Sequence, residues 1–357
     1  MGALSASCLP FFPRHDDIPD VGQGMVPPGV TASQRLPTLP PRALARRAVL
    51  GAAATLLGGS ACGARSLAQP LALPAAPGAA MEPLGALALD DRVLGFGGLS
   101  ALHLDPDLTI TAVSDLAHWM TARLVLDATG RPVGLEGLRT GPLRNDAGRP
   151  LARGYFGDSE SLARLPDGTW LVGFERWHRI RAYATLDGPG RYVAAPEALE
   201  QAPANGGLES LTVLADGRWL LLAEAYPPEG APTLRRGWIG TPGAWTPIAY
   251  RPAPGLDPVD AAPLPDGSAL VLERGFTLFG GFAGRLVRLP RRALAAAGAG
   301  TVLEGEALLD LAPPLPAENY EGVAAARVGE RTLVAMVSDD NENPLQRSLL
   351  LVFAMAE

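Results

Sequence analysis

A nine-residue pattern recurs three times, and its spacing constrains the fold more than any other feature. The copies are 160–168, 209–217 and 259–267, and they begin 49 and then 50 residues apart. Each copy ends in Asp-Gly and is followed by a short apolar run, as in two strands joined by a tight turn. Asp-Gly supplies the positive φ angles of such a turn, and a repeat of about 50 residues made of hairpins indicates a β-propeller.

The length of the chain sets the expected number of blades. Dividing the residues after position 68 by the period predicts six blades, with five as the alternative. Weaker copies of the hairpin begin near Gly98 and Glu321, on either side of the clear ones. The apolar run Ser348–Met355 has no hairpin partner after it. We therefore expect an all-β propeller in which this C-terminal strand closes the ring against a strand near Ala86–Leu94, because closure removes two exposed edges.

The N-terminal part of the sequence predicts export. Arg46 and Arg47 precede the apolar run 48–57, and small residues follow up to Ala68, which is the order of a secretory signal. The paired arginines resemble a twin-arginine export signal, and the apolar run is too short to span a bilayer. We therefore expect a leader at 1–68, a linker at 69–81 and a propeller domain at 82–357, located in the periplasm or outside the cell, with no membrane span.

Composition excludes several kinds of chemistry. The two cysteines, Cys8 and Cys62, both lie in the expected leader, so the domain has no disulfide, thiol nucleophile or cysteine metal ligand. The sequence contains no lysine, which excludes Schiff-base chemistry and a phosphate-loop lysine. After residue 68 there are 24 arginines and 34 acidic residues, a net charge of −10. This acidity argues against nucleic acid as a partner.

Acidic side chains occupy corresponding positions in successive hairpins. Residues equally distant from a two-residue turn lie opposite each other. The expected opposite pairs are Glu160 with Glu175, Glu209 with Glu224, Asp260 with Glu273, Ser100 with Asp115, and Glu321 with Ser338, the last beside Asp339 and Asp340. If the first two strands of each blade are the innermost, these acids surround one mouth of the central channel. A bulge of one residue in a turn would shift the pairs.

Like charges that face each other destabilise a sheet, so the pattern calls for a compensating cation. Calcium is one candidate, because it is a hard ion that binds many oxygen ligands in loose geometry. Arginine is the other, since Arg176 and Arg274 directly follow two of the acids and Arg179 is close to them. The first alternative predicts a metal or ligand site, whereas the second predicts a structural lock between blades. His178 lies near the expected mouth and is either a proton carrier or a surface histidine packed on Trp177.

Several short motifs together resemble a known family. They are Phe96–Ser100, Glu160–Leu162, Leu165–Gly168, Phe174–Arg176, Gly207–Leu211, Leu272–Arg274, Asn319–Gly322 and Ser338–Asn341. This set is similar to the phytase-like domain, also called the "esterase-like activity of phytase" family, over roughly residues 95–355. The resemblance implies an exported bacterial β-propeller that hydrolyses phosphate esters. The β-propeller phytases, which are relatives in name, bind calcium ions and use a calcium-bound water.

These observations lead to the hypothesis of an exported, calcium-assisted phosphoesterase that acts on a small-molecule substrate at the channel mouth. Glu160, Glu209 and His178 would be catalytic. The arginines that would bind the substrate are Arg176, Arg179, Arg274 and Arg347. The carboxylates that would hold calcium are Asp115, Glu175, Glu224, Asp260, Glu273, Glu321, Asp339 and Asp340. Two alternatives remain open: a non-catalytic propeller that binds a ligand or protein, and a calcium-dependent lactonase or esterase, since a propeller supports all three functions.

Overall fold

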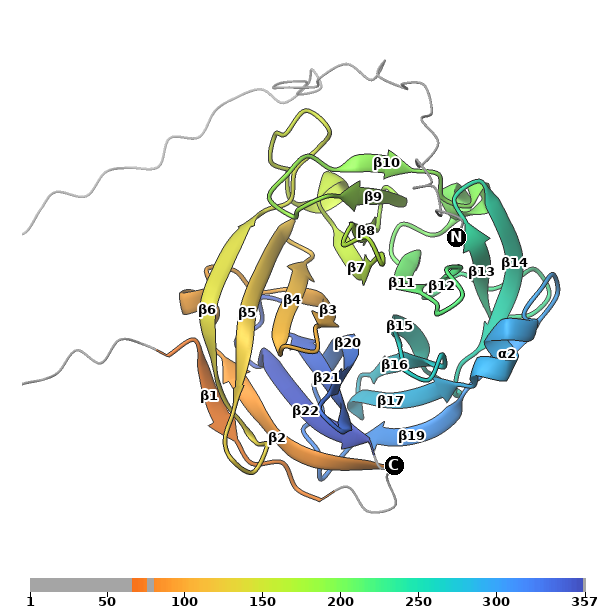
Figure 1. The fold of residues 1–357 in the computed structure, drawn as a ribbon. Coiled ribbons are helices and arrows are strands. Elements are labelled where there is room, and N and C mark those ends of the chain that lie inside the picture. Colours follow the sequence, from red (N-terminus) through yellow and green to blue (C-terminus); the bar gives the residue numbers. More distant parts are fainter. Residues whose placement is uncertain (1–65, 76–79, 356–357) are drawn as a thin grey trace, which may run out of the picture. The chain divides into compact units, whose positions relative to one another are not determined.

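Five mainly antiparallel sheets form a ring around a narrow central channel in the computed structural model, which describes residues 66–75 and 80–355 (Figure 1). The first blade contains β3 (Leu99–Leu104), β4 (Thr109–Ser114), β5 (His118–Leu126) and β6 (Pro132–Pro142). The second contains β7 (Ser159–Arg164), β8 (Trp170–Phe174), β9 (Arg179–Tyr183) and β10 (Arg191–Val193). The third contains β11 (Leu208–Val213), β12 (Trp219–Ala223), β13 (Arg235–Thr241) and β14 (Ala244–Arg251), and β18 (Val302–Glu304) pairs in parallel with β14.

The remaining two blades complete the ring. The fourth contains β15 (Asp257–Pro263), β16 (Ala269–Thr277), β17 (Gly281–Leu289) and β19 (Glu306–Leu311). The fifth contains β20 (Asn319–Val328), β21 (Arg331–Asp339), β22 (Leu349–Met355), β2 (Met81–Leu89) and β1 (Ala68–Leu71). Two short helices, α1 (Asp91–Leu94) and α2 (Arg291–Ala296), lie in connections between strands. Within 66–75 and 80–355, no helix is long and apolar enough to cross a membrane.

The propeller prediction is confirmed, and the number of blades is five, the alternative that the sequence allowed. The preferred count of six failed because the repeat is not uniform. The innermost strands begin 60, 49, 49 and 62 residues apart. The first interval contains the long β5–β6 hairpin, and the last contains α2 and β18. Only the two short intervals match the period from which six blades was calculated.

The C-terminal strand closes the ring, as expected. In Figure 1, β22 lies between β21 and the N-terminal β2, and Leu351 is paired with Ala86. The N-terminal strand ends at Leu89, earlier than expected, because the Asp90 side chain accepts a hydrogen bond from the Arg92 amide and caps α1. Residues 68–71, expected in the leader and linker, pair with β2 as the outer strand β1. The rest of the expected leader, residues 1–65, lies outside the described residues.

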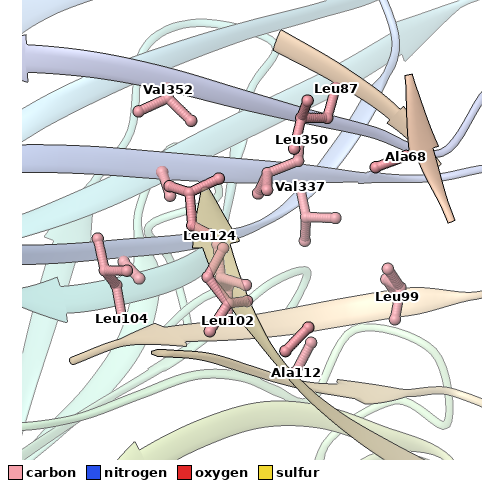
Figure 2. Packing of buried hydrophobic residues seen from close by; sticks show 14 of the residues in the cluster. Ala68, Leu87, Leu99, Leu102, Leu104, Ala112, Leu124, Val337, Leu350 and Val352 are labelled. Carbon is pink, nitrogen blue, oxygen red and sulfur yellow. The ribbon is translucent and has the colours of Figure 1, made fainter. Parts of the chain in front are cut away.

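The hydrophobic core lies between neighbouring blades. Between the fifth and first blades, Leu87, Leu350 and Val352 pack in one cluster with Leu102 and Leu124 (Figure 2). All five side chains are at most 3% exposed. Burying a leucine or valine side chain contributes about 1.5–3 kcal/mol, so these contacts hold adjacent sheets face to face. The innermost strands are thereby fixed around the channel, and their ends form its two mouths.

Candidate functional site

A β-bulge occurs at the same place in all five innermost strands. The strand pairing skips Ser100 in β3, Glu160 in β7, Glu209 in β11, Val259 in β15 and Glu321 in β20. A bulge adds one residue to a strand and changes the direction of its side chain. Three of the five bulged residues are therefore glutamates, each near the start of the innermost strand of its blade. They lie at the end of the hairpin opposite its turn.

The three glutamates meet inside the channel. Carboxylate oxygens of Glu160, Glu209 and Glu321 lie within 4.8 Å of one another. Only β7 and β11 are neighbours in the ring, so these side chains come together across the channel rather than along one sheet. All three residues are less than 10% exposed. The structure thus brings the acids of three blades into one buried cluster at one mouth.

The expected opposite pairing of Glu160 with Glu175 is wrong by two positions. The Leu165 amide donates to the Thr169 carbonyl (2.8 Å), so the turn has three residues and not two. Gly168, at φ 91°, is the extra residue of that turn. The bulge at Glu160 shifts the pairing once more. As a result, the Glu175 amide donates to the Asp158 carbonyl (2.8 Å), and Asp158 is the residue across from Glu175.

Asp158 is a member of the cluster that sequence reasoning missed. Two further groups of carboxylates have oxygens within 4.8 Å of one another, Asp158 with Glu160 and Glu175, and Glu175 with Glu209 and Glu224. Together with the central group they form a continuous set of six acids, which we call the carboxylate cluster: Asp158, Glu160, Glu175, Glu209, Glu224 and Glu321. Asp158 lies two positions before Glu160, outside the nine-residue pattern, and Asp257 holds the corresponding position in the third repeat, so extending the pattern upstream is the signal that could have found it.

Burial and mutual repulsion perturb the acids of the carboxylate cluster. Loss of solvation raises the pKa of Glu160 well above its usual range, and the nearby charge of Glu321 raises it further. Desolvation likewise raises the pKa of Glu209, with the charge of Glu160 as the next cause. Among the described residues, none donates a hydrogen bond to the Glu209 carboxylate. A carboxylate that is 5% exposed and lacks a donor calls for a cation or a proton.

Arg274 supplies positive charge on one side of the carboxylate cluster. Its guanidinium donates to Glu224 Oε1 (2.7 Å), to Glu321 Oε1 (2.9 Å) and to Asn319 Oδ1 (2.6 Å). Although burial opposes its charge, the carboxylates of Glu321 and Glu224 raise the pKa of Arg274 above its usual value. Arg274, expected to bind substrate, is therefore held by ion pairs. This is the arginine alternative, which Arg274 realises for two of the six acids.

Glu175 is fixed by the loop that leads into β11. Its Oε1 accepts hydrogen bonds from the amides of Gly206 and Gly207, the latter at 3.0 Å. Gly206 has a φ of 134°, and a Cβ there would lie 2.6 Å from that of Ala225, so only glycine fits this position. Both hydrogen bonds go to the same oxygen, which leaves Oε2 for another partner. The loop thus orients a carboxylate without neutralising it.

Asp260 and Glu273 lie outside the carboxylate cluster, contrary to expectation. The bulge of their blade is at Val259, which places Asp260 one position later than Glu160 and Glu209 in their repeats. The Asp260 carboxylate accepts hydrogen bonds from the amides of Ala261 and Val323, both at 2.8 Å, and so ties β15 to β20. Glu273 accepts hydrogen bonds from the Tyr250 hydroxyl and from the Ala253 amide (3.2 Å). Both carboxylates therefore join separate segments of the propeller through hydrogen bonds.

Three other expected ligands lie beside the cluster: Asp115 follows β4 in the first blade, Asp339 ends β21 in the fifth blade, and Asp340 follows it. Asp115 and Asp339 both feel the charge of Glu321, but burial is the main cause that raises their pKa values, to about 7 and about 8. Asp115 Oδ1 is buried without a hydrogen-bond partner among the described residues. Asp340 accepts hydrogen bonds from the amides of Gly98 (3.4 Å) and Glu342 (3.2 Å). Asp115 and Asp339 extend the negative charge of the mouth.

His178 and Arg179 have structural environments. The His178 ring contacts the Pro203 carbonyl through Nε2 (2.9 Å), and a Cβ at Gly207 would lie 1.9 Å from its Cε1. The Arg179 guanidinium lies 4.1 Å from the centre of the Phe174 ring and donates to the Trp177 carbonyl (2.7 Å), and burial lowers its pKa to about 10. His178 is therefore packed against the loop before β11, and Arg179 against aromatic rings.

The last two expected substrate ligands are more accessible. The Arg176 side chain is 46% exposed, and its Nε lies 2.5 Å from Asp158 Oδ2 in the carboxylate cluster. Arg347 is 55% exposed and donates to Glu318 Oε1 at 2.7 Å. Of the four arginines, Arg176 thus combines contact with the carboxylate cluster and exposure at the mouth. It could reach both a bound ion and an anionic ligand.

A family model described as "Phytase-like: Esterase-like activity of phytase" matches residues 94–342. The chain belongs to the phytase-like family. The matched region includes every member of the carboxylate cluster and all five innermost strands. No curated protein matches the chain.

Solved structures with a similar arrangement share little sequence with this phytase-like propeller. An α-L-arabinofuranosidase of Podospora anserina is 12% identical over 81% of this chain and 96% of its own, with a TM-score of 0.43. A putative gluconolactonase is 11% identical over 80% of this chain and 96% of its own, with a TM-score of 0.39. A virginiamycin B lyase of Staphylococcus aureus is 11% identical over 79% of this chain and 80% of its own, with a TM-score of 0.36. Likenesses this distant carry no information about the reaction.

The donor set of this phytase-like domain fits a hard divalent cation. Calcium binds carboxylate oxygens at about 2.3–2.6 Å, so two oxygens on one ion are separated by at most about 5 Å. The three groups of carboxylate oxygens, each within 4.8 Å, meet this requirement without rearrangement. Asp115, beside the cluster, also presents a buried oxygen, Oδ1, that no described residue satisfies. The buried acidic cluster could therefore hold a metal ion, although Arg274 already pairs with two of its members.

Proposed function

We propose that this protein is a calcium-assisted hydrolase of phosphate esters, with its active site at the carboxylate cluster. The observation that carries the proposal is the meeting of Glu160, Glu209 and Glu321 across the channel within 4.8 Å. Membership in the phytase-like family supports phosphate esters as the substrate class. We further propose that the protein acts in the periplasm or outside the cell, on the basis of the export signal pattern at 46–68.

The side chains of the cluster have distinct tasks in this proposal. Glu160, Glu209 and Glu321 would hold the ion, and Glu175 would add Oε2 because its other oxygen is held by backbone amides. A bound calcium ion would offset the charge of the carboxylates, polarise the phosphoryl oxygens and acidify a coordinated water. Arg176, exposed at the mouth, would orient the phosphate through its guanidinium. Glu209, whose carboxylate accepts no hydrogen bond from any described residue, would receive the proton of the attacking water.

Phosphate release by the purified full chain tests this function. With calcium present, we expect release from phytate or p-nitrophenyl phosphate, loss of release with a chelator, and recovery when calcium is restored. Glu209→Gln removes the proton acceptor and an ion ligand, so we expect the rate to fall by about 100-fold or more. Glu330→Gln, a change at an exposed turn, is the matched control and should leave the rate unchanged. No release from either substrate with calcium would refute the proposal.

One observation favours a second candidate, a non-catalytic propeller that binds a ligand on the same face. Arg274 already pairs with Glu224 and Glu321, as a structural lock requires. Under this alternative, Glu160→Gln changes ligand capture or stability and no ester is hydrolysed. The same assay with a lactone substrate separates the third possibility, a calcium-dependent lactonase, because that enzyme would turn over lactones and leave phosphate esters intact.

A further inference from the structure

Four aromatic side chains of the second blade and the connection before it contact one another. Trp177 lies at the centre, with its ring 5.8 Å from the Phe156 and Tyr192 rings and 6.3 Å from the Tyr155 ring, measured between ring centres. The other three residues are between 48% and 55% exposed, and Trp177 is partly buried. We call these four side chains the aromatic platform. Rings that contact one another and stay half open form a patch onto which a ligand can pack.

Two buried arginines fix the aromatic platform from the protein side. The Arg179 guanidinium lies 4.6 Å from the centre of the Trp177 ring and donates to the carbonyls of Trp177 (2.7 Å) and Phe156. The Arg181 guanidinium lies 4.0 Å from the centre of the Tyr192 ring. Both arginines are less than 5% exposed. The rings are therefore held in place before a ligand binds, which lowers the entropic cost of binding.

The aromatic platform adjoins the carboxylate cluster at Arg176. This arginine directly precedes Trp177, and its Nε lies 2.5 Å from Asp158 Oδ2. A Cβ at Gly154 would lie 3.6 Å from the Arg176 Nη1, so the guanidinium lies over the start of the turn Gly154–Phe156. That turn carries two rings of the platform. The cation that would orient a phosphate is thus next to the carboxylate cluster on one side and next to exposed rings on the other.

The orientation of the rings favours a planar ligand. The ring planes of Tyr155 and Trp177 are within 7° of parallel, so a single planar group can lie parallel to both. We propose that the aromatic platform binds the aryl group of a phosphate ester whose phosphate lies at Arg176. This inference rests on the proposed function for the phosphate end of the ligand, and it adds the chemical class of the group that the phosphate is attached to.

Phosphonates test the aromatic platform without turnover, because their carbon–phosphorus bond replaces the ester bond that a phosphoesterase cleaves. In titration calorimetry of the full chain with calcium, we expect phenylphosphonate to bind about tenfold more tightly than methylphosphonate, since only the former adds a stacked ring. Cyclohexylphosphonate has a ring of similar size that is not planar. We expect it to bind more weakly than phenylphosphonate.

Two variants assign the preference for a ring to the platform. Tyr155→Ala and Trp177→Ala should each bring the affinities for phenylphosphonate and methylphosphonate within about twofold of each other, because a stacking surface is removed. The affinity for methylphosphonate should stay unchanged, which shows that the variants are folded and that Arg176 still binds the phosphonate group. Phe279→Ala is the matched control, since it removes an exposed ring of the fourth blade outside the platform, and it should keep the full preference.

Three results would overturn the proposal: no binding of phenylphosphonate, equal affinity for phenylphosphonate and either of the other two phosphonates, or a preference that survives in both Tyr155→Ala and Trp177→Ala. Failure of the proposed function has a different signature. A preference for the ring without hydrolysis of any ester would leave the platform as a binding site and refute the phosphoesterase. Hydrolysis without a preference for the ring would do the reverse.

Discussion

Arg274 and the carboxylates around it show how single residues balance the charge of the mouth. The guanidinium pairs with Glu224 and Glu321, and Arg176 pairs with Asp158. Removing one partner of a buried ion pair is strongly destabilising, because the other charge stays buried without compensation. A structural lock and a metal site therefore differ in what compensates the buried carboxylates. Arginine alone compensates them in a structural lock, whereas a bound ion shares this role in a metal site.

Replacing Arg274 distinguishes a structural lock from a metal site. We expect Arg274→Met to lower the free energy of unfolding by about 3–5 kcal/mol in a chelator, since Glu224 and Glu321 lose their partner. Calcium should restore part of this loss if the cluster binds the ion. Urea titrations with calcium and with chelator measure both values. An equal loss of unfolding free energy with calcium and with chelator would favour a structural lock without a bound ion.

The acids also predict how stability depends on pH when calcium is removed. The pKa values of Asp115 and Asp339 are raised from 3.8 to about 7 and about 8 in the folded protein. Between about pH 4 and pH 8 the folded state therefore binds more protons than the unfolded state, so the free energy of unfolding falls as pH rises through this window. Thermal melts in chelator should show a falling midpoint from pH 5 to pH 8. A midpoint that rises over this range would contradict the account.

At the scale of the hairpin, sequence predicted the elements well and their register poorly. The repeats correctly indicated paired strands around Asp-Gly, but that dipeptide fits both a two-residue turn and the three-residue turn at Gly168. A one-residue slip turns a side chain to the other face, which is why Asp260 becomes a lock although Glu160 enters the cluster. The aligned repeats contained a usable signal for this difference, because Val259 and not Asp260 corresponds to Glu160.

The loop before β11 offers a test at the same scale. We expect Gly207→Ala to destabilise the protein by about 1–3 kcal/mol, since the new Cβ would lie 1.9 Å from the His178 ring and would displace the amide that holds Glu175. Gly217→Ala is the control, because its Cβ meets nothing within 4 Å and the positive φ alone costs about 1 kcal/mol. Chemical denaturation measures the free energy of unfolding of both variants. Equal losses in Gly207→Ala and Gly217→Ala would contradict the close contact between Gly207 and His178.

At the scale of the whole molecule, ring closure by β22 holds the first and last blades together. The strand pairs with β21 on one side and with β2 on the other, so the two halves of the fifth blade come from opposite ends of the chain. This long-range pairing was predictable from the lone C-terminal strand. The number of blades was not, because the long β5–β6 hairpin and the insertion of α2 and β18 add length without adding repeats.

Disrupting the closing strand should unfold the entire ring. Val352 is fully buried in β22, so Val352→Asp places an unpaired charge in the core, and we expect a loss of more than about 4 kcal/mol. Leu71→Asp, a change on the partly exposed outer strand of the same blade, should cost less than about 1 kcal/mol. Circular dichroism melts compare the two, and a cooperative melt of Val352→Asp at the unchanged temperature would argue against closure by β22.

The central claim is that acids from different blades form one cation site in the channel. Titration calorimetry of calcium into the chelator-treated full chain tests it most directly, with Glu209→Gln as the variant and Glu330→Gln as the control. The account predicts saturable binding to the unchanged protein and the control, and binding at least tenfold weaker in Glu209→Gln, because one buried ligand is lost. Absence of saturable binding, or equal binding to Glu209→Gln, would contradict it.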